Sequence, residues 1–353
     1  MGQGLDPAHS AANLVPADQS GRPPGPQDSV PDSPTFSVVI PTHNRAAIVG
    51  RALRSVTAQS FDDYEVIVVD DGSSDSTPAF LETVRSPRCR VLRNERGLGV
   101  SAARNRGAGA ATGHWISFLD DDDEMRPQAL AALHARSISC PQLDFLWGGR
   151  LIHERDNAGR EIARREDDWS RAASTVSGSS FLSLALRIAT NSVFTIRRAV
   201  FQAVGGFDEQ LRVSEDRDLF IALAEHGYKG APVAQTVVDV DEGSASLSRG
   251  ASGRGGADID LRVIDKHREY LCRPEHRAFL DDYLLAVFAG YLQEGNRSAA
   301  MRVFGDLRQR RALEYRVLRK YVHHAPEFRA LKRLIRYDLI RQIAYNIGKA
   351  QSS

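Results

Sequence analysis

The chain has few cysteines and no long apolar run, and each shortage excludes a class of protein. Its 353 residues contain three cysteines, Cys89, Cys140 and Cys272, with no metal-ligand spacing, and they cannot all pair with one another. We therefore expect reduced thiols in a cytoplasmic chain and no disulfide framework. No apolar run approaches the roughly 18 to 20 residues that span a bilayer, and the N-terminus has no basic segment followed by an apolar one. Secretion and membrane spanning are not expected.

An excess of charge of one sign is also missing. The 46 Lys and Arg nearly balance the 45 Asp and Glu, and we expect no nucleic-acid partner. The charges are nevertheless separated by region, because residues 301–353 carry 13 Lys and Arg against 4 Asp and Glu. No zinc pattern is present either: His153, His226, His323 and His324 have the wrong spacings, which favours surface or core positions for them.

What the chain does have is a hydrophobic content of 42% and an alternation of strand and helix patterns. Residues 1–34 are rich in Pro, Gly, Ser, Ala and Asp and are predicted to be a disordered leader. Short apolar strands are then predicted at 36–40, 64–69, 89–92 and 115–119, with helices between them at 46–59, 77–85 and 99–112. This order predicts an α/β fold with a mostly parallel sheet flanked by helices, within a domain at 35–274.

Carboxylates stand directly after two of these strands. Asp120, Asp121, Asp122 and Asp123 follow the strand at 115–119, and a second carboxylate pair follows the strand at 64–69. Neighbouring like charges repel unless a cation lies among them, and Mg²⁺ and Mn²⁺ prefer carboxylate oxygens. Because ligands of such sheets bind beyond the carboxyl ends of the strands, the pattern indicates one ligand crevice. A solvated acidic turn is the alternative.

The chain after residue 150 reads differently. A less regular, charged stretch up to 178 is predicted to be a surface insertion facing the site, and helices are predicted at 197–204 and 215–227. Trp115 and Trp147, at strand ends, are predicted to lie in the core.

Residues 275–353 are predicted to be a helical C-terminal region that begins with a helical hairpin. Within it, residues 325–349 contain an apolar stripe at helical spacing with Lys and Arg away from the stripe. A basic amphipathic helix of this kind either lies on an anionic membrane surface or packs against the folded domain. We therefore expect a cytoplasmic protein, with peripheral contact at the inner membrane face as one of two alternatives.

Six motifs, in order, resemble the family 2 glycosyltransferases, which have the A-type nucleotide-sugar-binding fold. The resemblance covers residues 36 to about 248, and its motifs are Val38-Val39-Ile40-Pro41-Thr42-His43-Asn44-Arg45, Val68-Val69-Asp70-Asp71-Gly72-Ser73-Ser74-Asp75, Ala103-Arg104-Asn105, Phe118-Leu119-Asp120-Asp121-Asp122-Asp123, Gly205-Gly206-Phe207-Asp208-Glu209 and Ser214-Glu215-Asp216-Arg217-Asp218-Leu219. The resemblance implies an enzyme that moves a sugar from a nucleotide-diphosphate donor, expected to be a UDP-sugar, to a glycan or lipid-linked acceptor.

The resemblance assigns donor-binding roles to residues at the first, second and third motifs. Asp71 matches the aspartate that recognises the base, because a carboxylate can accept the ring N–H of uracil. Pro41, Thr42 and Asn44 belong to the segment that lines the base and ribose, and Arg104 lies near the nucleotide. A helix cap or Asx-turn is the alternative for Asp71, and structural roles are the alternative for Thr42 and Arg104.

The Asp-x-Asp element of the family corresponds to Asp120-Asp121-Asp122. The resemblance makes Asp122 a ligand of Mn²⁺ or Mg²⁺ and places Asp120 on the ribose or on a metal-bound water. Where the family has a histidine that contacts the metal or diphosphate, this chain has Asp241, which can supply an oxygen ligand but adds negative charge.

Asp216 corresponds to the family's general base, which takes the proton of the attacking acceptor hydroxyl. Spacing alone does not separate it from Glu215 and Asp218, and helix capping is the alternative role for Asp216 or Asp218. One base and direct displacement predict inversion at the anomeric carbon. The Gln-x-x-Arg-Trp element of processive members is absent, which favours transfer of a single sugar.

Two other functions compete with this interpretation. A sugar-phosphate nucleotidyltransferase needs a Gly-rich phosphate loop near the N-terminus, and the segment at 41–45 is not such a loop. A non-catalytic nucleotide-sugar or glycan-binding protein is the second alternative, and retention of the motif carboxylates argues against it. Trp169, in the charged insertion, is a candidate to stack on an acceptor sugar, although the balance of the interpretation is against this role.

Overall fold

The computed structural model describes residues 33–156, 158–167, 169, 174–186, 188, 193–242 and 255–309. These residues form two compact units. The first comprises the chain up to Val176 together with Thr190–Glu209 and Tyr228–Gly243, and the second comprises Ser177–Ala189, Gln210–Gly227 and the chain from Ser244 on. Most of the predicted leader 1–34 and all of segment 325–349 lie outside the described residues. The predicted domain boundary between 274 and 275 stays a prediction.

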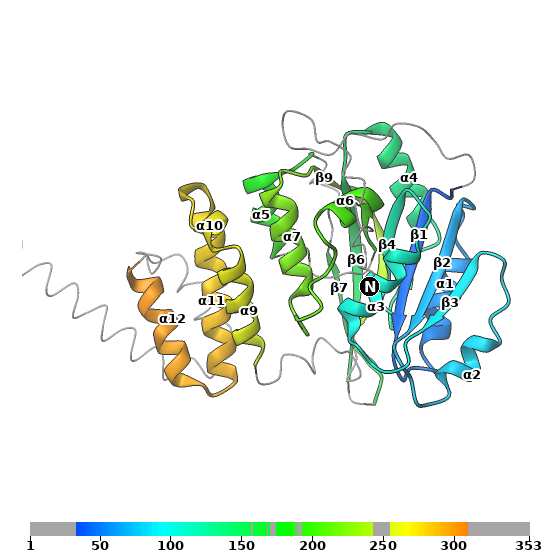
Figure 1. The fold of residues 1–353 in the computed structure, drawn as a ribbon, viewed down its shortest axis with the longest axis horizontal. Helices are drawn as coiled ribbons and strands as arrows, with labels where there is room; N and C mark the ends of the chain where they lie inside the picture. Colours follow the sequence, from blue (N-terminus) through cyan, green and yellow to red (C-terminus); the bar gives the residue numbers. More distant parts are fainter. Residues whose placement is uncertain are drawn as a thin grey trace, which may run out of the picture. The chain divides into compact units, whose positions relative to one another are not determined.

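The first unit is built on one sheet of nine described strands, in the order β3-β2-β1-β4-β8-β6-β9-β5 with β7 paired to β6 (Figure 1). The strands are β1 (Phe36–Thr42), β2 (Tyr64–Asp70), β3 (Cys89–Arg93), β4 (Trp115–Phe118), β5 (Glu124–Met125), β6 (Phe145–Arg155), β7 (Glu161–Asp167), β8 (Phe194–Arg197) and β9 (Gly230–Glu242). The first four pair in parallel, as predicted, whereas β8 runs antiparallel to both β4 and β6. The predicted α/β fold is confirmed.

Helices cover both faces of this sheet because alternate strand residues point to opposite sides. The helices of the first unit are α1 (Val49–Thr57), α2 (Thr77–Glu82), α3 (Val100–Ala110), α4 (Ala129–Ser139) and α6 (Arg198–Ala203). Phe36, Val38 and Ile40 of β1 pack in one cluster with buried residues of α1 and α4. Val39 points the other way, towards α3, where a Cβ on Gly107 would come within 2.4 Å of Val39 Cγ1.

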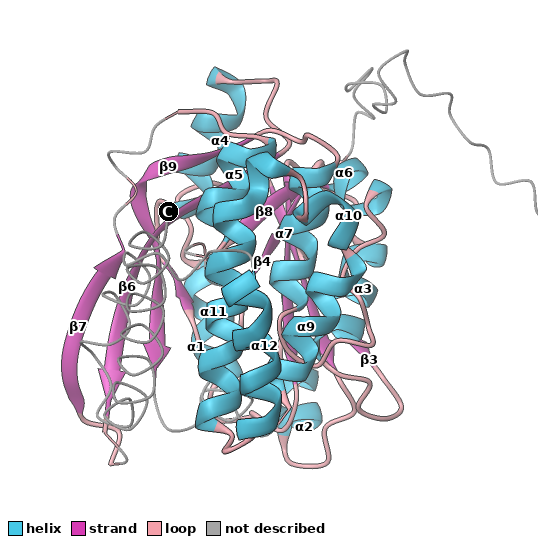
Figure 2. Ribbon diagram, turned by 90° about the vertical axis from the view of Figure 1, so that its left-hand side faces the viewer, coloured by secondary structure: helices cyan, strands magenta, loops and turns pink. Residues whose placement is uncertain are grey.

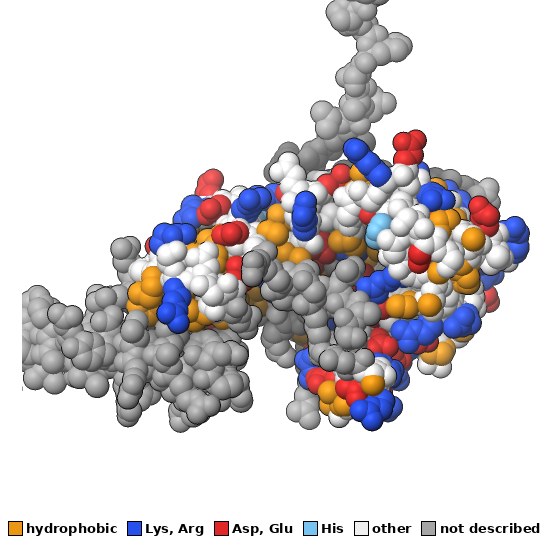
Figure 3. Space-filling model, turned by 90° about the horizontal axis from the view of Figure 1, so that it is seen from below, with side chains coloured by type: hydrophobic (Ala, Val, Ile, Leu, Met, Phe, Trp, Pro, Cys, Tyr) orange, Lys and Arg blue, Asp and Glu red, His pale blue; other side chains and the backbone are white. Residues whose placement is uncertain are grey.

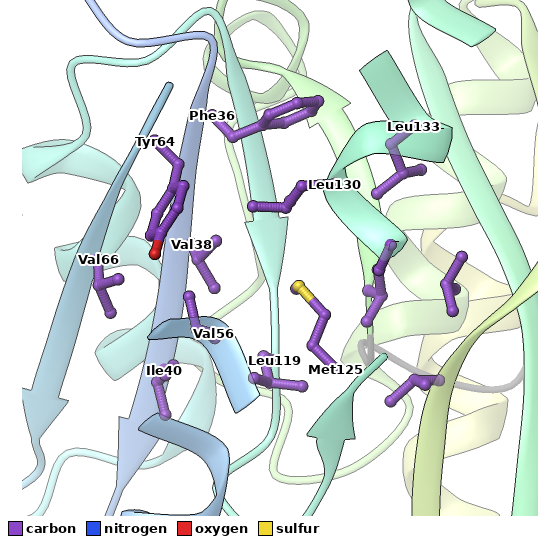
Figure 4. Packing of buried hydrophobic residues seen from close by; sticks show 14 of the residues in the cluster. Phe36, Val38, Ile40, Val56, Tyr64, Val66, Leu119, Met125, Leu130 and Leu133 are labelled. Carbon is purple, nitrogen blue, oxygen red and sulfur yellow. The ribbon is translucent and has the colours of Figure 1, made fainter. Parts of the chain in front are cut away.

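Figure 4 shows the cluster on the α1 and α4 side. Its labelled residues come from β1, β2, α1, β5, α4 and the residue after β4, among them Tyr64, Val66, Met125 and Leu119. Burying one such side chain stabilises the fold by roughly 1.5 to 3 kcal/mol, so this cluster holds the strands whose ends carry the motif residues.

The prediction that the chain after residue 150 is less regular was wrong up to residue 167, although β7 lies at the surface as predicted. Residues 145–155 and 161–167 form the antiparallel strands β6 and β7, and β6 also pairs in parallel with β9. The charged side chains misled the prediction because β7 is an exposed edge strand, and its charges pair across the ladder, as Asp167 does with Arg150 at 2.7 Å. A polar edge strand lacks the apolar alternation that marks half-buried strands.

The three tryptophans all lie in the core. Trp115 and Trp147 are 4% and 3% exposed, which confirms their prediction. Trp169 is 4% exposed, and its ring packs edge-to-face on Trp147 with centroids 5.7 Å apart. A ring buried in this way is not available to stack on an acceptor sugar, so the stacking role suggested for Trp169 was wrong.

The described part of the second unit is helical. Its helices are α5 (Gly178–Ala185), α7 (Glu215–Glu225), α9 (Gly256–Lys266), α10 (Arg268–Leu271), the 3₁₀ turn η1 (Pro274–His276), α11 (Arg277–Gln293) and α12 (Arg297–Gln309). The predicted helix at 215–227 is confirmed as α7, and the predicted helical hairpin is confirmed by α11 and α12, which pack together (Figure 2). α9 also packs on α11, and α5 packs on α7.

The described surface carries charges of both signs. On the face in Figure 3, Lys and Arg side chains lie interspersed with Asp and Glu side chains. Among the described helices, none has both the length and the apolar character required to cross a membrane.

A buried histidine in the second unit makes stability depend on pH. The ring of His267 is 2.9 Å from Glu225 and 3.1 Å from Asp218, and Lys266 also contacts Asp218 at 2.9 Å. Burial lowers the pKa of His267, but its hydrogen bonds to Asp218 and Glu225 outweigh burial, so the pKa is raised above its ordinary value.

We therefore expect His267 to stabilise the fold fully below its unfolded pKa of about 6.5, with this contribution lost as the pH rises through the folded pKa. Chemical unfolding of wild type and His267→Gln at a series of pH values tests this. The stability difference should shrink as the pH rises from about 6.5 through the folded pKa, by at most about 1.4 kcal/mol per pH unit. The exposed His226→Gln variant is the control, and a pH-independent difference for His267→Gln contradicts the prediction.

Candidate functional site

The motif residues of the first unit meet at the carboxyl ends of three adjacent parallel strands. β1 lies between β2 and β4, with Thr42 opposite Asp70 in the β1–β2 register. The backbone N–H of Asp71 donates to the carbonyl of Thr42 at 2.8 Å. The Thr42 hydroxyl donates to Asp121 Oδ2 at 2.6 Å. Thr42 therefore joins the carboxylates that follow β2 to those that follow β4, and the predicted crevice residues are brought together.

Three carboxylates form the densest acidic group among the described residues. Asp120, Asp122 and Asp123 each offer an oxygen atom within 4.8 Å of the others. Asp120 and Asp122 are the predicted metal-site residues, whereas Asp123 was not singled out although it belongs to the same acidic run. Asp123 is 4% exposed. An oxygen-only set of this kind fits a hard divalent cation such as Mg²⁺ or Mn²⁺.

Among the described residues, two arginines form ion pairs with carboxylates of the acidic run. Arg45 Nη1 lies 2.7 Å from Asp122 Oδ2 and 3.5 Å from Asp121 Oδ1. Arg104 Nη2 lies 2.6 Å from Asp120 Oδ1. Sequence reasoning assigned no role to Arg45, although it stands at the end of the first motif. Its guanidinium now compensates part of the negative charge at the site.

Burial and the repulsion between neighbouring carboxylates disfavour full ionisation of the acidic run. Burial and the neighbouring Asp122 and Asp120 raise the pKa of Asp121 to about 7, against the opposing effects of the Thr42 hydrogen bond and Arg45. Burial and Asp120 also raise the pKa of Asp122. Carboxylates in this condition gain from a cation among them, because the cation offsets both desolvation and mutual repulsion.

Asp71 is 6% exposed, and its carboxylate is already well supplied with donors. Asn94 Nδ2 donates to Oδ1 at 2.6 Å, and the backbone N–H groups of Leu98 and Gly99 donate at 2.9 and 2.8 Å. These bonds hold Asp71 against the loop before α3. The Leu98 N–H also reaches Oδ2, at 3.1 Å, so three donors make four hydrogen bonds to a carboxylate that has about four acceptor positions.

Asn44 and Arg104 both make structural contacts. Asn44 has a φ of 54°, and its Oδ1 accepts from the backbone N–H of Ser74 at 2.8 Å. Asn44 thereby ties the first motif to the second. Arg104 is 3% exposed, and its guanidinium lies 5.5 Å from the centroid of the Phe207 ring. Nucleotide contacts of Asn44 and Arg104, and of the buried Pro41, stay predictions.

Asp241 is held by two arginines. Arg155 Nε donates to its Oδ1 at 2.9 Å, and Arg51 Nη1 lies 3.3 Å from its Oδ2. The backbone N–H of Asp241 donates to Asp123 Oδ1 at 3.3 Å, so β9 reaches the edge of the acidic group. Its carboxylate is not one of the three that form that group. Metal ligation by Asp241 stays a prediction. The ion pairs with Arg51 and Arg155 compensate the negative charge of Asp241, which a neutral histidine at this position would not have.

Asp216 belongs to the first turn of α7 in the second unit. Its neighbours Glu215 and Asp218 are buried, with 8% and 3% exposure, and Asp218 is paired with Lys266 and His267. Asp216 is half-buried, and its Oδ1 accepts a hydrogen bond from the backbone N–H of Arg217 at 2.8 Å. Among these three acids, burial therefore favours Asp216 as the one able to meet a substrate.

Comparison with known proteins agrees with this arrangement. Residues 37–205 match the sequence model of glycosyl transferase family 2. The succinoglycan biosynthesis protein ExoO of Rhizobium meliloti is 32% identical over 62% of this chain and 64% of its own length. A GalNAc(5)-diNAcBac-PP-undecaprenol beta-1,3-glucosyltransferase of Campylobacter jejuni is 32% identical over 37% of this chain and 42% of its own. The chain thus spans less than two thirds of the length of these relatives.

A solved structure supports the fold. The crystal structure of S. aureus TarS 1-349 in complex with UDP superposes with a TM-score of 0.54 and 20% identity, covering 72% of each chain. That similarity extends to the fold of the sheet and its flanking helices. From the matched sequence model and the motif geometry, residues 37–205 are a glycosyl transferase family 2 domain.

Proposed function

We propose that this protein is an inverting, metal-dependent glycosyltransferase that moves a single sugar from a nucleotide-diphosphate sugar to an acceptor hydroxyl. The observation that carries the proposal is the junction at Thr42, which links Asp71 to Asp121 of the acidic run after β4. Base recognition and charge compensation of a diphosphate are needed side by side in such an enzyme, and the junction provides residues suited to both.

A UDP-sugar is the donor that the related structures favour. TarS has been crystallised with UDP and with UDP-GlcNAc, and its fold resembles that of this chain. In our proposal Asp71 accepts the ring N–H of the base, while Pro41, Thr42 and Asn44 line the base and ribose. The names of the relatives favour an acceptor that is a glycan or a lipid-linked glycan in polysaccharide biosynthesis.

Asp120 and Asp122 are proposed to hold Mn²⁺ or Mg²⁺, with Asp123 and Asp241 beside them. When bound, the cation stabilises the negative charge that develops on the diphosphate leaving group. Arg45 and Arg104 then keep the ligand carboxylates in place through the ion pairs that they form with Asp122 and Asp120.

Asp216 is proposed as the general base that accepts the proton of the acceptor hydroxyl during its attack on the anomeric carbon. Direct displacement by that hydroxyl inverts the configuration, so an α-linked donor becomes a β-linked product. A cytoplasmic location and membrane contact through residues 325–349 also remain proposals, and that segment lies outside the described residues.

Calorimetric titration tests the donor class. Purified protein is titrated with UDP, GDP and dTDP, each with Mn²⁺ and with chelator. We expect UDP to bind in the presence of Mn²⁺ and at least about tenfold more weakly in chelator, because the diphosphate charge is then uncompensated. Binding that is equally tight with chelator contradicts metal dependence, and preference for GDP or dTDP contradicts the UDP assignment.

A non-catalytic nucleotide-sugar or glycan-binding protein is the alternative function. It predicts the same calorimetric result without product formation. To distinguish the two functions, the protein is incubated with labelled UDP-sugars and the release of UDP is measured. Release faster than hydrolysis in a protein-free control supports the transferase, and release at the control rate supports the binding protein.

A further inference from the structure

Ser214, at the start of α7, has a backbone conformation that needs support. Its φ of 62° and ψ of 16° are left-handed, which side-chain-bearing residues rarely adopt. Ser214 makes no side-chain cap hydrogen bond to α7. Its hydroxyl donates instead to Asp260 Oδ1 on α9, at 2.6 Å. The turn that leads into Asp216 is therefore fixed by another helix.

Asp260 holds three partners at one oxygen atom. Besides Ser214, Oδ1 lies 2.7 Å from Arg217 Nη1 and accepts the hydroxyl hydrogen of Tyr283 at 2.9 Å. The Tyr283 side chain is fully buried, and the Arg217 guanidinium lies 5.5 Å from the centroid of its ring. α9 and α11 thus supply the contacts of Ser214 and Arg217, which precede and follow Asp216 in the chain.

The last residue of α9, Lys266, and the residue after it, His267, pair with Asp218 in the same turn of α7. Lys266 and His267 contact Asp218 at 2.9 and 3.1 Å. Asp216 itself makes a hydrogen bond only to its neighbour's backbone among the described contacts, so its direction depends on the turn that carries it. Burial strengthens these charged contacts relative to the same contacts in water.

We propose that Asp260 and Tyr283 are positioning residues for sugar transfer. Their contacts fix the positions of Ser214 and Arg217 and thereby orient Asp216 towards the acceptor. This inference rests on the proposed function of Asp216. None of the sequence motifs includes Asp260 or Tyr283. Their role arises from the packing of α9 and α11 in the second unit.

The same two helices supply a matched control. Asp258, two residues before Asp260, accepts a hydrogen bond from the hydroxyl of Tyr291, also on α11. This second carboxylate–tyrosine pair joins α9 to α11, and none of its described contacts reaches the first turn of α7. Asp258→Asn and Tyr291→Phe therefore remove similar chemistry from the same helices without touching the turn at Asp216.

The test compares Asp260→Asn and Tyr283→Phe with Asp258→Asn and Tyr291→Phe in the full chain. We expect Asp260→Asn to lower kcat by up to about 100-fold, because small misplacements of a reacting group have effects of that size. The donor KM and the calorimetric Kd for UDP with Mn²⁺ should stay unchanged, and Tyr283→Phe should have a smaller effect in the same direction. Both control variants should keep the wild-type kcat. An equal loss of kcat in the two aspartate variants overturns the inference.

Hydrogen exchange of the amides at 214–218 supplies a readout that does not need turnover. Asp260→Asn should accelerate exchange there, and Asp258→Asn should not. If exchange at 214–218 is unchanged in Asp260→Asn, the inference is overturned, whether or not the wild type transfers a sugar. If the wild type transfers no sugar from any donor, that result counts against the proposed function. Faster exchange with wild-type kcat also overturns it, because the turn would then be loosened without effect on the reaction.

Discussion

Replacing Asp216 with Asn is expected to reduce sugar transfer by about 10² to 10⁴-fold while donor binding is kept. The amide cannot accept the proton of the acceptor hydroxyl, and removal of a general base has effects of that size. The change preserves shape, and Asn can still accept the hydrogen bond that the Arg217 backbone N–H donates to Asp216 at 2.8 Å. Initial rates with a UDP-sugar, together with UDP titration in Mn²⁺, measure the two properties separately.

The control for this variant is Asp265→Asn, on α9 in the same unit. The Asp265 side chain is 58% exposed and pairs only with Arg268 among the described contacts, so its loss should leave transfer unchanged. If Asp216→Asn retains transfer within a few-fold of wild type, Asp216 is not the base. If UDP binding falls together with transfer, the residue has a role in donor binding instead.

The second large effect is expected from Asp122→Asn, which should weaken Mn²⁺-dependent UDP binding by at least about tenfold, or 1.4 kcal/mol. Asp122 supplies one of the three clustered carboxylates, and an amide oxygen carries no charge to attract a divalent cation. In chelator, wild type and variant should bind UDP equally. Calorimetry with and without Mn²⁺ gives both values.

A matched change elsewhere in the first unit is Asp62→Asn. The Asp62 side chain is 87% exposed and pairs with Arg88 at 3.0 Å, far along the chain from the acidic run. It should bind UDP and Mn²⁺ as the wild type does. The assigned metal role of Asp122 is contradicted if Asp122→Asn keeps full Mn²⁺ dependence, or if it loses UDP binding in chelator to the same extent.

Local patterns predicted the first half of the fold well. The strands at 36–40, 64–69, 89–92 and 115–119 correspond to β1 to β4, and the intervening helices to α1, α2 and α3. These elements are predictable because buried parallel strands are continuous apolar runs bounded by turn residues. The hairpin of β6 and β7 was missed because an exposed edge strand with cross-paired charges has no such signature.

The site was predictable in a similar way, up to a limit. The acidic run and Asp71 could be placed at one sheet edge because each directly follows a parallel strand. Partners from distant parts of the chain could not be predicted in this way. Arg155 and Arg51 reach Asp241, and Arg45 reaches Asp122, through contacts that span 77 to 190 positions.

The sequence by itself determined the fold class, the carboxylates at the strand ends and the family motifs, because these depend on periodicity and on residues close together in the chain. Only the tertiary structure decided which acid of the Glu215-Asp216-Arg217-Asp218 turn stays accessible and which partners hold that turn. The physical reason is that burial and ion pairing depend on α9 and α11, whose contacts with α7 no local pattern encodes.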